Sequence, residues 1–177
     1  DYMKVALIIG HNQRSKGAYS QIIGSEYDYW KRISEKIKNE IPGLADVYER
    51  KPNKTYIPEM NKVLEELNKN SYKFCLELHF NASDNSQANG CECLVYYKNN
   101  KAKELATNFM ARLQNLFNSK IRGNYGIIEI KDSKTRGGYG ICNSKDTYIL
   151  VEPFFGSSPE EALKFSVESD VVSLFIS

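Results

Sequence analysis

The chain has 177 residues, of which 41% are hydrophobic and 26% are charged, close to the usage of ordinary globular proteins. This composition excludes a disordered or fibrous chain, and the apolar runs are too short to span a membrane. The formal net charge of +2, from 24 basic and 22 acidic residues, is too balanced to favour nucleic acid as a partner. Residues 1–4 run straight into a strand-like segment and show no secretion signal. We therefore expect one domain over residues 1–177 that binds neither nucleic acid nor membrane.

Hydrophobic patterning alternates between strand-like and helix-like segments along the chain. Short apolar runs predict strands at residues 4–9, 46–49, 72–80, 91–97, 127–130 and 147–151. Apolar residues at helical spacing predict helices at residues 25–39, 58–70, 102–118 and 159–175. Ser25 is the expected N-cap of the first helix, and the glycines between residues 123 and 140 indicate loops. This order predicts a single α/β domain with a mainly parallel sheet covered by helices.

Three polar residues stand at the ends of predicted strands. His11 follows the first strand, His79 ends the segment Phe-Cys-Leu-Glu-Leu-His, and Glu152 ends Tyr-Ile-Leu-Val-Glu. Ligands of open α/β sheets bind at the carboxyl ends of the strands. The chain has only two histidines, and both lie at such ends. We favour a functional role for the three residues over simple capping of their strands.

Two imidazoles indicate a zinc site, because a carboxylate ligand then completes three protein ligands and leaves one position open. Glu26 is the candidate third ligand, since it lies in the first turn of a helix that follows the loop after His11. The alternative role of Glu26 is to complement the helix dipole. Glu152 is then the candidate general base for attack on a carbonyl. Its alternative role is an ion pair with a lysine such as Lys145.

Other residues compete for these roles. Glu77 lies two residues before His79 and shares its face of the strand. Cys91 and Cys93 also share a face and, with a histidine, would form a structural zinc site, although their spacing is not typical of one. A cysteine nucleophile paired with histidine is a weaker alternative. We expect the four cysteines, which include Cys75 and Cys142, to be free and mostly buried thiols.

At these residues the chain resembles the zinc-dependent N-acetylmuramoyl-L-alanine amidases of the Amidase_3 family, found in bacterial autolysins and phage endolysins. The matching segments run in the family's order along nearly the whole chain. They are Ile-Gly-His at 9–11, Ser-Glu-Tyr-Asp at 25–28, Leu-His-Phe-Asn-Ala at 78–82, Gly-Cys-Glu-Cys-Leu-Val-Tyr-Tyr at 90–97, and Leu-Val-Glu-Pro-Phe-Phe-Gly at 150–156 with the Ser-Ser-Pro-Glu-Glu that follows.

The resemblance implies that His11, Glu26 and His79 hold one Zn²⁺ and that Glu152 is catalytic. It implies a twisted, mostly parallel sheet of about six strands with helices on both faces. The implied activity is hydrolysis of the amide between N-acetylmuramic acid and L-alanine in peptidoglycan, which degrades the bacterial cell wall. Such a protein acts on the cell wall. It is either encoded by a phage and released through the host membrane, or secreted. It commonly carries a wall-binding domain, which would follow Ser177.

Some positions depart from the family pattern. Ile-Ile-Gly-His stands where Asp-Pro-Gly-His is frequent, and serine precedes Glu26 where asparagine is common. An arginine often found near the catalytic strand has no match at residues 141–144, although Arg136-Gly137 resembles a nearby motif. These departures bear on substrate preference. Two alternatives stay open: another zinc amide hydrolase, such as a peptidoglycan peptidase or deacylase, and a non-catalytic wall-binding module.

Overall fold

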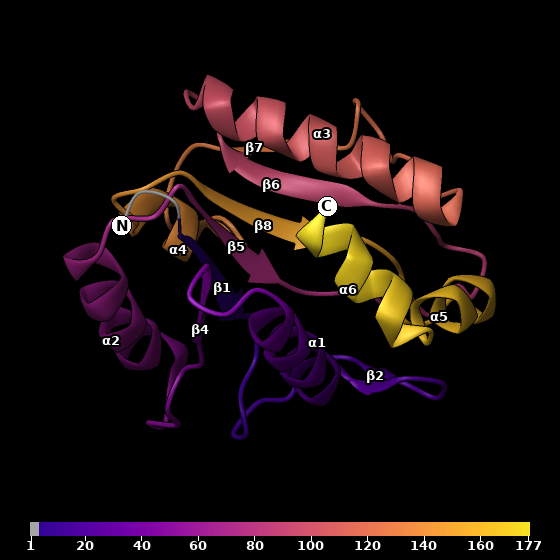
Figure 1. Cartoon of the computed structure of the whole chain (residues 1–177), viewed down its shortest axis with the longest axis horizontal. Coiled ribbons are helices and arrows are strands. Elements are labelled where there is room, and N and C mark those ends of the chain that lie inside the picture. Colours follow the sequence, from indigo (N-terminus) through magenta and orange to yellow (C-terminus); the bar gives the residue numbers. More distant parts are fainter. Residues whose placement is uncertain (1–3) are drawn as a thin grey trace.

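A six-stranded sheet forms the centre of the computed structural model, which describes residues 4–177 (Figure 1). Its strands are β1 (Val5–Ile9), β4 (Ala45–Tyr48), β5 (Phe74–Leu78), β6 (Glu92–Tyr96), β7 (Ile127–Ile130) and β8 (Tyr148–Glu152). Their order across the sheet is β4-β1-β5-β8-β6-β7. The first four strands in this order are parallel, β6 is antiparallel to β8, and β7 is parallel to β6. The predicted mostly parallel α/β fold is thereby confirmed. Residues 1–3, which belong to the segment without a predicted secretion signal, lie outside the described residues.

Helices cover both faces of this sheet, as predicted (Figure 1). They are α1 (Glu26–Glu40), α2 (Tyr56–Lys69), α3 (Asn100–Phe117), α4 (Gly138–Asn143), α5 (Pro159–Phe165) and α6 (Glu168–Ile176). Helices α1, α3 and α6 pack on one face, and α2 and α4 pack on the other. Among residues 4–177, none of the helices has the length and apolar character that crossing a bilayer requires.

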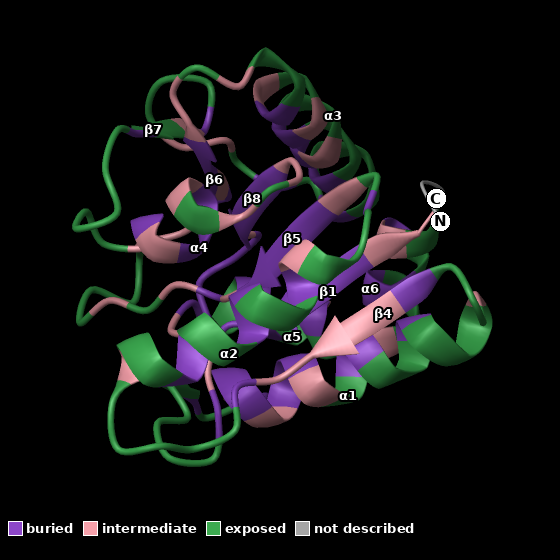
Figure 2. Ribbon diagram, turned by 90° about the vertical axis from the view of Figure 1, so that its left-hand side faces the viewer, coloured by how far each residue is buried: buried purple, intermediate pink, exposed green. Residues whose placement is uncertain are grey.

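The core has two parts because successive strand residues point to opposite faces of the sheet. On one face Leu7 and Val151 pack with Trp30 of α1, and on the other Ile8 and Leu150 pack with Met60 of α2. Figure 2 shows the central strands β1, β5 and β8 buried and the edge strand β4 only partly covered. Because these strands are buried on both faces, their sequences are continuous apolar runs.

The predicted helix at residues 159–175 is wrong, because the chain forms two helices there. Val167 has a non-helical backbone and separates α5 from α6. The expected apolar stripe is interrupted as a result, with Leu163 60% and Val167 47% exposed. Helix α6 begins at Glu168, whose carboxylate accepts hydrogen bonds from Arg32 and Lys36 of α1. The spacing of apolar residues within this segment does not indicate these contacts with α1.

Two further elements lie in segments that were expected to be loops. Helix α4 forms within the glycine-rich region, and the short hairpin of β2 (Tyr19–Ser20) and β3 (Gly24–Ser25) precedes α1. The N-cap prediction is confirmed, because the Ser25 hydroxyl accepts a hydrogen bond from the backbone N–H of Asp28 at 3.1 Å. The hairpin and this cap together determine where α1 begins.

Candidate metal and catalytic site

The carboxyl ends of three neighbouring strands bring His11, His79 and Glu152 to one edge of the sheet. Strands β1, β5 and β8 lie side by side and run parallel, and the three residues follow or end them. All three line a cleft of about 670 Å³ at this edge. This is the convergence that the strand ends predicted.

Glu26 reaches the same cleft from the first turn of α1. Its Oε1 accepts a hydrogen bond from the backbone N–H of Ala18 at 2.9 Å, and its Oε2 accepts one from Phe80 at 3.1 Å. The side chain is only 7% exposed. These contacts hold the carboxylate inside the cleft.

The two histidines flank the Glu26 carboxylate. His11 Nε2 lies 3.4 Å from Oε1, and His79 Nδ1 lies 3.3 Å from Oε2. Their rings meet edge to face with centroids 5.1 Å apart. One ligand atom from each of the three residues lies within 4.8 Å of the others. A tetrahedral ion with bonds of about 2.0–2.1 Å separates its ligand atoms by about 3.4 Å, so this donor set suits zinc.

Charge pairing within this group shifts the pKa of two members. Burial alone would raise the pKa of Glu26, but hydrogen bonds with His11 and His79 lower it to about 2. Burial alone would lower the pKa of His79, but hydrogen bonds with Glu26 and Glu77 raise it to about 10. The imidazole of His79 therefore holds its proton at neutral pH in the metal-free chain, and the carboxylates that stabilise this positive charge would equally stabilise a bound cation in its place.

The pKa of Glu152 is shifted upward, in the opposite direction to that of Glu26. Burial raises its pKa to about 7, against the effect of His79, and the negative charge of Glu92 adds to the rise. Glu92 lies opposite Glu152 because β6 runs antiparallel to β8. Lys145 does not pair with Glu152, since its ammonium donates to the backbone oxygen of Asn70 at 2.7 Å. A carboxyl group that titrates near neutral pH is suited to transfer protons.

The raised pKa of Glu152 predicts a pH-dependent stability difference in metal-free protein. The pKa is about 7 in the folded chain and 4.5 in the unfolded chain. The folded state therefore binds more protons between these values, and the contribution of Glu152 to stability is lost as pH rises through about 7. Glu152→Gln should match the wild type most closely near pH 4 and exceed it by up to about 3 kcal/mol near pH 9. Urea unfolding with a chelator present measures this difference, and a difference constant with pH would contradict it.

Gly10 leaves the space that the His79 ring occupies. A Cβ atom at position 10 would lie 2.3 Å from two atoms of the ring. We expect Gly10→Ala to displace the ring and to destabilise the fold by about 1–3 kcal/mol. Urea unfolding and the imidazole NMR signals of His79 measure the two effects. Gly43→Ala is the control: nothing lies within 4 Å of the new Cβ, but the φ of +83° strains alanine, so this variant should lose stability through its backbone and leave the His79 signals in place.

A buried ion-pair network braces the loop that carries His11. Arg50 donates to the backbone oxygen of Gly10 at 2.5 Å and lies 3.4 Å from Glu59. Arg14 donates two hydrogen bonds to Glu59, at 2.8 and 3.0 Å. Sequence reasoning missed this network, because its members come from three separate segments and none lies in a recognisable motif.

The competing cysteine site does not form. Cys91 and Cys93 are fully buried free thiols, and burial raises the pKa of both, that of Cys91 to about 12. Cys75 is also a buried free thiol, and Cys142 is partly exposed. Within residues 4–177, the one group of three or more potential metal ligands is His11, Glu26 and His79.

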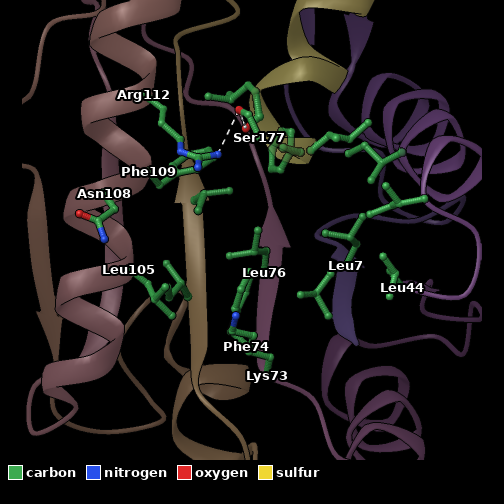
Figure 3. Close-up of a pocket in the computed structure, with 18 residues that line it drawn as sticks. Leu7, Leu44, Lys73, Phe74, Leu76, Leu105, Asn108, Phe109, Arg112 and Ser177 are labelled. Atoms are coloured by element: carbon green, nitrogen blue, oxygen red, sulfur yellow. Dashed lines mark hydrogen bonds between the residues drawn. The ribbon is translucent and has the colours of Figure 1, made fainter. Parts of the chain in front are cut away.

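A second hollow, of about 430 Å³, lies away from this edge, on the face of the sheet that α1, α3 and α6 cover (Figure 3). Apolar side chains such as Leu7, Leu76 and Phe109 line it, and Arg112 donates a hydrogen bond to Ser177 at its rim. Its lining includes no histidine, cysteine or carboxylate side chain. This hollow therefore offers neither the carboxylates nor the histidines that line the first cleft.

Comparison with known proteins places the chain in a family. No curated protein matches it. The catalytic domain of an endolysin that targets Clostridia difficile is 26% identical, with a TM-score of 0.77 over 99% of this chain and 95% of that one. The CwlD amidase of Clostridioides difficile, solved with the GerS lipoprotein, is 20% identical, with a TM-score of 0.75 over 97% and 92%. An N-acetylmuramoyl-L-alanine amidase of Clostridium difficile is 22% identical, with a TM-score of 0.71 over 99% and 95%. The model of the N-acetylmuramoyl-L-alanine amidase family Amidase_3 matches residues 5–173, and the chain belongs to this family.

Proposed function

We propose that this protein hydrolyses the amide bond between N-acetylmuramic acid and L-alanine in peptidoglycan and thereby degrades the bacterial cell wall. The observation that carries the proposal is the convergence of His11, Glu26, His79 and Glu152, from four separate elements, in one cleft of a chain of the amidase family. A module that only bound the wall would not need this complete set of acid–base and ligand groups.

We infer that His11, Glu26 and His79 hold one Zn²⁺ ion. Two imidazoles and a carboxylate are a common catalytic zinc set, and the spacing of their atoms fits a tetrahedral ion. A bound zinc ion would supply Lewis acidity to the attacked carbonyl and to water at neutral pH. Two observations support the same inference: Arg50 bonds to the backbone oxygen of Gly10, next to His11, and the missing Cβ at Gly10 leaves room for the His79 ring.

Glu152 acts as the general base and then as the general acid in this mechanism. Its carboxylate takes a proton from the water whose oxygen bonds to the lactyl carbonyl carbon. The carbon–nitrogen bond then breaks, and Glu152 returns the proton to the leaving amine of L-alanine. A pKa near 7 suits both transfers, because the same group must accept and release a proton near neutral pH.

We further propose that residues 1–177 belong to the catalytic domain and that its partner is peptidoglycan, both the glycan strand and the stem peptide. Because peptidoglycan is the substrate, the protein acts at the cell wall. It reaches the wall either as a phage-encoded protein that is released through the host membrane or by secretion. A wall-binding domain on the full-length chain would bring the catalytic domain to its substrate.

Digestion of purified peptidoglycan with the zinc-loaded protein, followed by mass spectrometry, tests the function. Soluble stem peptides that begin at L-alanine, with the glycan intact, are the expected products. Peptides cut internally would instead identify a peptidoglycan peptidase, and release of acyl groups would identify a deacylase. Stoichiometric zinc without any product would contradict an enzymatic role and favour a wall-binding module.

A further inference from the structure

Glu77 lies directly behind His79 and outside the candidate ligand group. The two residues are two apart along the end of β5, so their side chains share a face of the sheet. The Glu77 side chain is only 6% exposed. A carboxylate buried this far from water requires polar partners, and those partners indicate what it does.

Both oxygens of Glu77 have a partner. Oε2 lies 2.5 Å from Nε2 of His79, and Oε1 accepts a hydrogen bond from the Tyr148 hydroxyl at 2.5 Å. Because carboxylate oxygens accept hydrogen bonds, this arrangement places a hydrogen on Nε2 of His79. The other nitrogen, Nδ1, is the one that lies 3.3 Å from Glu26. Glu77 therefore contacts the side of the imidazole that faces away from the candidate ligand group.

The packing around Tyr148 holds this contact in place. Tyr148 is 2% exposed and reaches Glu77 from β8, the strand next to β5. Helix α4 leaves room for the phenol, since a Cβ atom at Gly140 would lie 2.6 Å from the Tyr148 hydroxyl oxygen. Two strands and a helix thus fix the position of one carboxylate.

We propose that Glu77 is a positioning residue that orients His79 and keeps its hydrogen on Nε2, so that Nδ1 presents its lone pair to a metal shared with His11 and Glu26. This inference rests on the proposed metal site. Histidine ligands in proteins generally donate their second ring N–H to an outer carboxylate, carbonyl or water, and loss of that partner typically costs 10–100-fold in metal affinity.

Zinc affinity of the whole chain, measured by competition with a chelator of known affinity, tests the role. Glu77→Ala should weaken zinc binding by about 10–100-fold and leave one zinc per chain at saturation. Glu77→Gln keeps an acceptor oxygen and should recover most of the affinity. Tyr148→Phe leaves Glu77 in place and should have a smaller effect than Glu77→Ala. Should Glu77→Ala fail to fold, the Nε2–H signal of His79 in the wild type keeps the proposal falsifiable, because the assigned hydrogen position requires that signal.

NMR of the zinc-loaded protein supplies a readout that a merely structural role would not change. In the wild type, the Nε2–H of His79 should give a slowly exchanging proton signal, because Glu77 accepts from it and shields it from water. Glu77→Ala should lose this signal, and Glu77→Gln should restore it. The matched control is Glu161→Gln, which alters a buried carboxylate bonded to the backbone of Gly90 and Phe155. The control should keep both the signal and the zinc affinity.

The following results would overturn the proposal. Unchanged zinc affinity in a folded Glu77→Ala chain, or a His79 signal that persists in it, would show that Glu77 does not position the ring. Loss of stoichiometric zinc in Glu77→Gln would make Glu77 a ligand instead. Failure of the wild type itself to bind zinc would remove the proposed metal site. This outcome is distinguishable from a failure of the positioning role alone, in which the wild type still binds zinc.

Discussion

Glu152→Gln should lose nearly all turnover and keep its zinc. Glutamine has nearly the same shape as glutamate but cannot carry a proton between the attacking water and the leaving amine. General acid–base catalysis contributes about 10²–10⁴-fold, so we expect a loss of that size in kcat. Glu152 is not one of the three grouped ligand residues, and zinc stoichiometry should be unchanged. The release of stem peptides from purified peptidoglycan measures turnover, and elemental analysis measures zinc.

Glu129→Gln is the matched control for this variant. It makes the same chemical change on β7, at a side chain that is 49% exposed and does not line the cleft. Turnover and zinc content should both stay at the wild-type level. Normal turnover in Glu152→Gln would disprove the proposed mechanism, and a joint loss of zinc and activity would make Glu152 a ligand instead of a base.

His79→Ala should lose both zinc and turnover. The variant removes one of three protein ligands, and we expect the affinity to fall by more than the roughly 100-fold that loss of an outer partner can cost. It also leaves the buried carboxylates of Glu26 and Glu77 without their shared partner. The metal-free variant should therefore be less stable than the metal-free wild type as well. Zinc titration and urea unfolding measure the two effects.

A second histidine variant separates metal loss from instability. The His11 side chain is 26% exposed, compared with 14% for His79. Its replacement by alanine should abolish zinc binding with a smaller loss of folding stability. Stoichiometric zinc in folded His79→Ala or His11→Ala chains would contradict the assigned ligand set.

Local sequence predicted most elements because their causes are local. The apolar run before His11 is buried on both faces, and the Ser25 hydroxyl caps α1 three residues ahead of Asp28. Strand ends can also be located from the sequence, and parallel neighbours bring their carboxyl ends to one edge. The same reasoning failed at Val167, where the helical spacing continues although the helix does not.

Partners of the site were harder to predict because they come from distant parts of the chain. Glu92 lies opposite Glu152 only because β6 reverses direction in the sheet. Arg50 contacts the backbone of Gly10 across 40 positions of the sequence, and Tyr148 contacts Glu77 across 71. The one local signal was the spacing of Glu77 and His79, which indicates a shared face but not a hydrogen bond.

The order of residues alone therefore establishes the α/β class, the three strand ends that bear His11, His79 and Glu152, and the resemblance to the amidase family. The first two depend on periodicity and position within short segments, whereas the resemblance depends on motifs that follow the family's order along nearly the whole chain. Only the tertiary structure decides that Glu26 lies between the two imidazoles, that burial raises the pKa of Glu152 to about 7, and that Glu77 contacts the back of His79. Those properties depend on which groups exclude water from one another and donate hydrogen bonds across strands, and such proximity exists only after the strands have paired.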